Sequence, residues 1–338
     1  MIVELMMMTG ANSPAAAFEA AADAIINGNA AMLRKLLADY PGLVQERSMR
    51  EHHSTLLHYV SANGVEDFRQ KTPKNIVEIT NLLLNAGAEV DAESDAYGGG
   101  CTALGLAATS VHPERAGVQI ALIETLLDRG ASLHLRAGGN NHSIVHGCIA
   151  NGQPAAAKFL ADRGAPLDME SAAALDRLDV LQSHFDGAGV GQTETSPQQI
   201  EAAFRYACGY GSLEAAKFLL ARGVDPAARE EKGQTALHWA CWGPEPEIIG
   251  LLLKCGAPVD ARDARFRATP LDTALWTWTN TSTEEVRQRC YHAVALLVRA
   301  GATLDLEHWR DSQKESPMLE KINADRRMQA ALRGEIER

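Results

Sequence analysis

Four residues in the first half of the chain have side chains suited to proton transfer: His52, His53, Tyr97 and His142. The histidines lie just before two segments of related sequence, and Tyr97 lies between those segments, directly before three glycines. Histidine titrates near neutral pH and a phenol can carry a proton, so a His52/Tyr97 or Tyr97/His142 pair could perform general acid-base catalysis. The sequence contains no G-x-S-x-G, H-E-x-x-H or G-x-x-x-x-G-K-[ST] motif. A catalytic hypothesis therefore rests on these four residues alone.

The net charge of the chain indicates which classes of partner it can bind. The 338 residues include 43 acidic and 32 basic side chains, which gives a net charge of −11. Phosphate backbones repel such a chain on average, so we expect no general nucleic-acid binding. Six cysteines without a C-x-x-C pair favour a reducing, cytoplasmic location, and we expect no metal and no cofactor. No stretch approaches the ~20 apolar residues of a membrane span, so we expect no membrane partner.

Two strings recur along the chain and indicate pairs of helices. The first is a Leu-Leu run that ends in glycine, as at 83–87 and 252–256, where the glycine is suited to stop a helix. The second begins with threonine, as in Thr-Ala-Leu-His-Trp-Ala at 235–240 and Thr-Pro-Leu-Asp-Thr-Ala at 269–274. Threonine caps a helix and proline suits its first turn. The stop glycines recur with a base period of about 33 residues.

This arrangement resembles the ankyrin repeat, whose signature is T-P-L-H-x-A. The resemblance implies an all-α solenoid, a curved stack of helix-turn-helix units with short turn hairpins. It predicts a flexible N-terminus at 1–14, a repeat domain at 15–305 and a C-terminal capping helix at 306–338. The predicted units are 15–48, 51–92, 97–137, 139–168, a degenerate 169–190, 198–229, 230–262 and 263–305.

In this family the fourth position of the threonine string is structural, and its imidazole ties one repeat to the next. His58, His146 and His238 occupy it here. The resemblance also implies a non-catalytic protein–protein interaction module that holds a peptide or protein surface in its concave groove. Crowding of four of the five tryptophans into 40 residues favours an anchor surface, although these rings could instead pack against an insertion at 278–290. The predicted binding residues are Asn63, Asn151, Tyr210, Trp242, Arg265, Phe266, Arg267 and Trp276.

Three predicted repeats contain extra residues between their helices, and two of these insertions, 64–75 and 109–119, belong to neighbouring repeats. They could form a basic lip that captures an anionic ligand or an acidic partner surface, or they could be solvated loops. We expect partly ordered surface loops, and we expect that deletion of 65–74 spares folding. The lip residues are Arg69, Lys71, Lys74, His112 and Arg115.

The alternative function is a small-molecule-binding protein or an enzyme, with the four proton-carrying residues in a pocket of repeats 2–4 under the insertions. One zinc ion cannot serve that site, because turn tips two repeats apart are separated by nearly twice the 8–10 Å spacing of packed helices. An enclosed pocket with perturbed histidines would favour this alternative, and exposed indoles would favour the interaction module.

Overall fold

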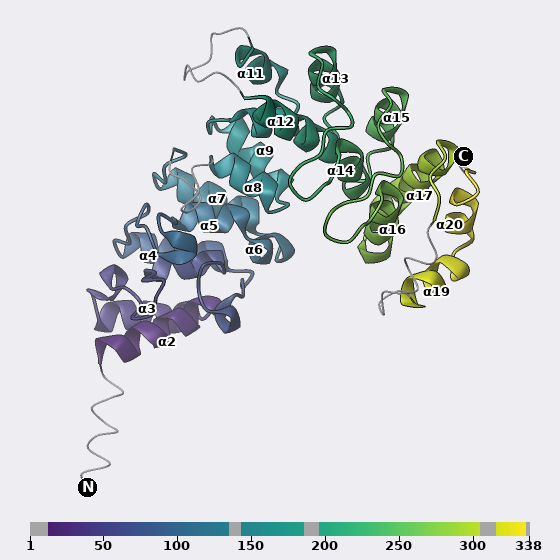
Figure 1. Cartoon of the computed structure of the whole chain (residues 1–338). Coiled ribbons are helices and arrows are strands. Elements are labelled where there is room, and N and C mark those ends of the chain that lie inside the picture. The colour runs from purple at the N-terminus through teal and green to yellow at the C-terminus, as the bar shows by residue number, and fades with distance from the viewer. Residues whose placement is uncertain (1–12, 135–142, 186–195, 305–315, 336–338) are drawn as a thin grey trace. The chain divides into compact units, whose positions relative to one another are not determined.

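Each half of the chain folds as a compact series of helices. The computed structural model describes residues 13–134, 143–185, 196–304 and 316–335, and it divides into unit 1, Met1–Asp168, and unit 2, Met169–Arg338 (Figure 1). The described residues contain no β-strand, only two isolated bridges, Arg47 with Thr55 and Ser94 with Cys101. The predicted all-helical class is confirmed.

Unit 1 arranges its helices in two rows. The first row consists of α2, η2, α5 and α8, and the second of α3, α4, α7 and α9, with contacts along and between the rows (Figure 1). The bounds are α2 (Pro14–Ile26), α3 (Ala30–Asp39), η1 (Leu43–Gln45), η2 (Leu56–Ser61), η3 (Asp67–Arg69), α4 (Ile76–Asn85), η4 (Ala96–Gly98), α5 (Ala103–Thr109), α6 (Val111–Arg115), α7 (Gln119–Asp128), α8 (Ile144–Ala150) and α9 (Pro154–Asp162).

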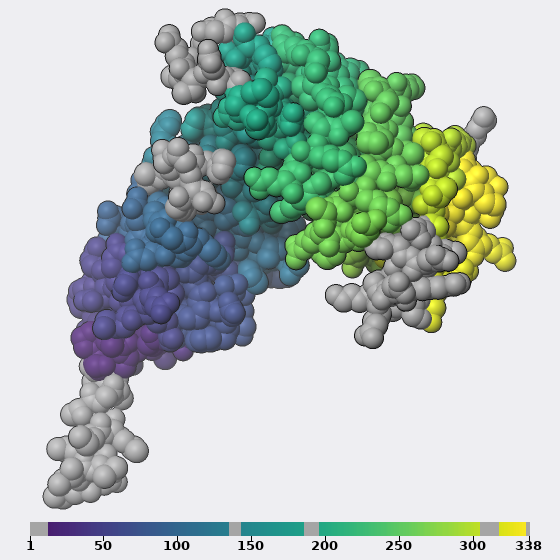
Figure 2. Space-filling view, viewed as in Figure 1, coloured from purple at the N-terminus to yellow at the C-terminus, as the bar shows by residue number. Residues whose placement is uncertain are grey.

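Unit 2 has the same two rows, closely packed in the space-filling view (Figure 2). Helices α10, α12, α14 and α16 form one row, and α11, α13, α15 and α17 form the other. The bounds are α10 (Met169–Ala174), α11 (Leu178–Ser183), α12 (Pro197–Gly209), α13 (Leu213–Ala221), α14 (Ala236–Trp242), α15 (Pro246–Lys254), α16 (Pro270–Asn280), α17 (Glu284–Arg299), α19 (Ser316–Ala324) and α20 (Arg326–Ala331). In the described part of the predicted capping segment, 316–335, two helices stand where one was predicted, because the Asp325 carboxylate caps a new start.

The histidines of the threonine string join neighbouring helix pairs. Nδ1 of His58 accepts from the Thr55 amide (3.1 Å), and Nε2 lies 3.0 Å from the carbonyl oxygen of Cys101 in the following pair. A carbonyl oxygen only accepts, so Nε2 must carry the proton and the neutral ring satisfies both bonds. His238 repeats this geometry with Thr235 (3.1 Å) and Ala268 (3.1 Å).

Acid should weaken unit 1 through His58. Burial lowers its pKa from 6.5 to about 4, so the unfolded chain takes up the proton first as pH falls. The stabilisation is complete above pH 6.5 and is lost as pH falls toward 4. We expect the free energy of unfolding to drop by about 2 kcal/mol from this residue between pH 7 and 5. Urea titrations at both pH values should show that loss in the wild type and in His134→Asn, an exposed control, but not in His58→Asn. An equal loss in all three would contradict it.

The insertions are built into the fold. In the first, Arg69 is only 3% exposed, and its guanidinium nitrogens lie 2.8 Å from carboxylate oxygens of Glu19 and Asp23 on α2. In the second, 111–115 forms α6, and the buried Gln119 amide donates to three main-chain carbonyls, of which Ala107 is one (3.1 Å). Arg69 in the first insertion is therefore buried rather than on a surface loop, and deleting 65–74 would remove a buried ion-pair partner of α2; that the deletion spares folding stays a prediction.

Candidate functional site

Two exposed indoles lie on neighbouring helices of unit 2. Trp242 is the last residue of α14 and Trp276 lies within α16, each seven residues after the threonine of its string. They are 48% and 53% exposed. The Thr277 hydroxyl donates to the Trp242 carbonyl oxygen (3.4 Å), which ties the two helix positions together. The structure thus gives both predicted anchors an accessible ring.

Trp278, in contrast, is buried. It is 5% exposed and its ring packs against Tyr291 of α17, 6.5 Å between centroids. Successive helical residues are 100° apart, so Trp276 and Trp278 point to nearly opposite sides of α16. Burial therefore applies to Trp278 and not to Trp276, although the ring that Trp278 contacts, Tyr291, lies one residue beyond the predicted insertion 278–290.

Tyr210 follows α12 and is half-buried. Its ring stacks on Tyr206, 6.5 Å between centroids, and Tyr206 meets Trp239 edge-on at 5.1 Å. Burial raises the pKa of Tyr210 to about 12, so its phenol stays protonated. This predicted anchor is accordingly part of a ring cluster rather than a free side chain.

The turn before α16 presents a third exposed ring. The Asp263 carboxylate accepts from the amides of Arg265 (3.0 Å) and Phe266 (2.6 Å), which fixes the turn. Phe266 is exposed, and the Arg265 guanidinium lies 4.8 Å from its ring centroid. Arg267 is also exposed. The predicted tip residues thus form an ordered, cationic and aromatic edge.

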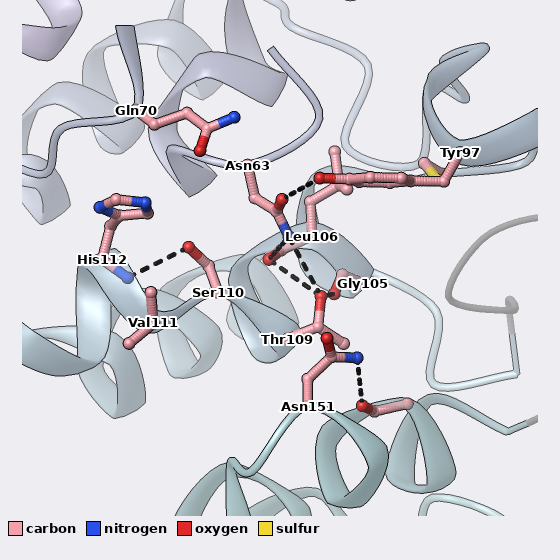
Figure 3. A pocket seen from close by; sticks show the side chains of 12 residues that line it. Asn63, Gln70, Tyr97, Gly105, Leu106, Thr109, Ser110, Val111, His112 and Asn151 are labelled. Carbon is pink, nitrogen blue, oxygen red and sulfur yellow. Dashed lines mark hydrogen bonds between the residues drawn. The ribbon is translucent and has the colours of Figure 1, made fainter. Parts of the chain in front are cut away.

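Unit 1 contains a pocket of about 500 Å³ (Figure 3). Asn63 lies at its centre: the amide oxygen accepts from the Tyr97 hydroxyl (2.6 Å) and its nitrogen lies 3.4 Å from the Thr109 hydroxyl. The lining residues are Asn63, Gln70, Tyr97, Cys101, Gly105, Leu106, Thr109, Ser110, Val111, His112, Gly147 and Asn151. The predicted groove residues Asn63 and Asn151 are therefore brought together with Tyr97 and with His112 of the second insertion.

The acid-base pairs are not formed among the described residues. Burial lowers the pKa of His52, and its Nε2 lies 3.8 Å from Glu66. His53 lies 2.7 Å from Asp95 through Nδ1, and neither histidine lines the pocket. The hydroxyl of Tyr97 bonds to an amide instead of an imidazole. His142 lies outside the described residues. Among the described residues the His52/Tyr97 pair is therefore not formed, and the Tyr97/His142 pair stays a prediction.

The structure removes one residue from the predicted basic lip. Arg69 does not belong to it, because three carboxylates, the third from Glu66 at 3.3 Å, already surround its buried guanidinium. Lys71, Lys74 and Arg115 are exposed and stay candidates for anion capture. The sequence reasoning missed Gln70, Gly105 and Gly147. The glycines carried a signal, since other copies of the threonine string have large side chains at those positions.

In the described part of the chain, no helix has both the length and the apolar character needed to cross a membrane. Residues 169–263 match a family model described as ankyrin repeats, three copies. The structure of the human ASB11 ankyrin repeat domain is also similar, with 21% identity, a TM-score of 0.41, and coverage of 84% of this chain and 99% of that one. The division into eight units stays a prediction. The protein therefore carries ankyrin repeats over residues 169–263.

Proposed function

We propose that the protein is a binding module that holds a protein partner on the aromatic surface of unit 2. Ankyrin repeats are generally protein–protein interaction modules. The observation that carries the proposal is the pair of half-exposed indoles, Trp242 and Trp276, at equivalent positions of adjacent helices. Tryptophan is the residue most enriched among interface anchors, because covering its large ring removes much apolar surface from water.

The side chains of the turn before α16 indicate the chemistry of the partner. Arg265 and Arg267 are exposed beside Phe266, whereas the carboxylate in the same turn, Asp263, is buried and occupied by main-chain amides. A partner segment with apolar side chains next to acidic ones fits this edge. The proposed interaction is a peptide or protein segment anchored by its apolar residues and oriented by its carboxylates.

Replacing Trp242 and Trp276 together by alanine should abolish partner capture without altering helicity. Each buried interface tryptophan contributes roughly 2 kcal/mol or more, so the double variant should bind about 1,000-fold more weakly. The control is Phe68→Ala, which removes an exposed ring from unit 1. Quantitative mass spectrometry should first find proteins that the wild type and the control capture and the double variant loses.

The affinity of such a protein, purified, should then be measured for all three by calorimetry. Equal affinity for wild type and double variant, at unchanged circular dichroism, would refute the proposed surface. Weakening by Phe68→Ala alone would instead place the contact in unit 1.

A further inference from the structure

We infer that the pocket of unit 1 binds an uncharged, planar group that donates N–H hydrogen bonds, the chemistry of a primary carboxamide. The pocket lies outside the proposed partner surface and has a size typical of small-ligand sites. Three features carry the inference: how the space is made, which polar atoms face it, and which charges it lacks.

Two glycines inside helices make room for the pocket. Gly105 of α5 stands where the threonine strings of other pairs have a histidine, as His58, and Gly147 of α8 stands where they have an aromatic residue, as Tyr59. Both line the pocket. A glycine inside a helix costs about 1 kcal/mol relative to alanine. Two neighbouring helix pairs therefore lack a side chain at adjoining positions, and the resulting space forms one cavity.

The amides of the lining turn their acceptors inward. Nδ2 of Asn151 donates to the Gly147 carbonyl (2.8 Å), and Nε2 of Gln70 donates to the Val65 carbonyl (3.0 Å). Main-chain carbonyls only accept, so these bonds fix both amide orientations. The side-chain oxygens of Asn151 and Gln70 are left to receive a donor from a ligand, and Figure 3 shows each directed toward the other lining residues.

Tyr97 supplies a flat face and a third acceptor. Its hydroxyl proton goes to Asn63, which leaves the phenolic oxygen free to accept. The residue has a φ of 52° and is 67% exposed, so this costly backbone conformation buries little of the ring. A planar amide or ring can stack on the exposed face.

The lining contains no carboxylate, lysine or arginine. A cationic ligand group would lose hydration there without gaining a counter-charge, and an anionic group would meet only the imidazole of His112. A neutral donor suffers no such loss and meets the acceptors of Asn151, Gln70 and Tyr97. The carboxamide could come from a free aromatic amide or from a glutamine or asparagine side chain of a peptide.

The test uses three ligands of one shape: benzamide, benzamidinium and benzoate. Binding to the full chain is followed by NMR titration of ¹⁵N-labelled protein. We expect saturable binding of benzamide with a Kd on the order of 1 mM, and at least about tenfold weaker binding of the cation and the anion. N-acetylglutamine methylamide separates the sources, since tighter binding than benzamide identifies a peptide side chain and weaker binding a free ring amide. Preference for either ion, or no saturable binding, overturns the inference.

Variants locate the binding. Gly147→Ala adds a methyl group to a residue that lines the pocket, and it should raise the Kd at least tenfold while preserving or increasing thermal stability. Gly250→Ala is its matched control, because Gly250 lies inside α15 with open space around it. Tyr97→Ala should also lose binding, and its exposed position keeps the fold intact. Unchanged affinity in both pocket variants overturns the assignment. The Trp242/Trp276 double variant should bind benzamide normally, so the two proposals fail separately.

Discussion

Replacing Gly243 by alanine should destabilise unit 2 by at least about 3 kcal/mol. Gly243 follows α14, and a Cβ on it would overlap the carbonyl oxygen of Gly209 at the end of α12 and lie 3.0 Å from the carbonyl carbon. Main chain cannot rotate away as a side chain does, so the helices must separate. The backbone of Gly243 is ordinary (φ −80°), which makes the predicted loss purely steric.

Urea unfolding of Gly243→Ala against Gly250→Ala isolates this effect, since both add one methyl group and Gly250 has no atom within 4 Å of the added carbon. Gly209→Ala should fall between them, because its Cβ would meet the Trp239 ring at 3.2 Å and a ring can shift. A wild-type midpoint for Gly243→Ala would show that the two helix ends are less tightly opposed than described.

Arg69→Ala should destabilise unit 1 by about 3 kcal/mol. The substitution leaves the carboxylates of Glu19, Asp23 and Glu66 without the guanidinium that connects them. Removing one partner of a buried ionic group costs about 3–5 kcal/mol, and we take the lower end because Glu19 and Asp23 remain partly hydrated. Although burial acts to raise the pKa of Glu19, hydrogen bonds from Arg50 and Arg69 hold it below its usual value.

The measurement is the free energy of unfolding at pH 7. Arg34→Ala serves as the control, since it breaks the exposed pair with Glu78 and should cost less than about 1 kcal/mol. Arg69→Lys should recover only part of the loss, because an ammonium cannot serve three carboxylates with fixed N–H directions. If Arg69→Ala matches the control, the first insertion is not held to α2 by this residue.

The helix pairs could be predicted from the sequence because their determinants are local. A capping threonine and a stop glycine act within a few residues of themselves. Gly223, with a φ of 85° and nothing near its missing Cβ, shows that a backbone requirement alone selects glycine at such a position. The fate of the first insertion could not be predicted, because Arg69 pairs with Asp23, 46 residues earlier, and its neighbour Lys71 is exposed.

The candidate sites were partly within reach of sequence reasoning. Trp276 and Trp278 are two residues apart in one helix, and this spacing places the two rings on nearly opposite sides of that helix. The pocket was harder to predict, because Gly105 and Gly147 become significant only when their helices are known to be neighbours. The His52/Tyr97 pairing failed for a related reason, since Asn63 is the residue that reaches the phenol.

The histidine bonds between helix pairs can form only in a fixed order during synthesis, because each acceptor follows its histidine in the chain. The imidazole of His58 needs an acceptor 43 residues later, and that of His238 one 30 residues later. During synthesis each ring therefore lacks its acceptor until the following turn has left the ribosome. Asp272, at the equivalent position of the last string, accepts from the amide of its own Thr269 (2.8 Å), as His58 and His238 accept from theirs. Nascent unit 1 should thus gain protection from proteases one helix pair behind elongation.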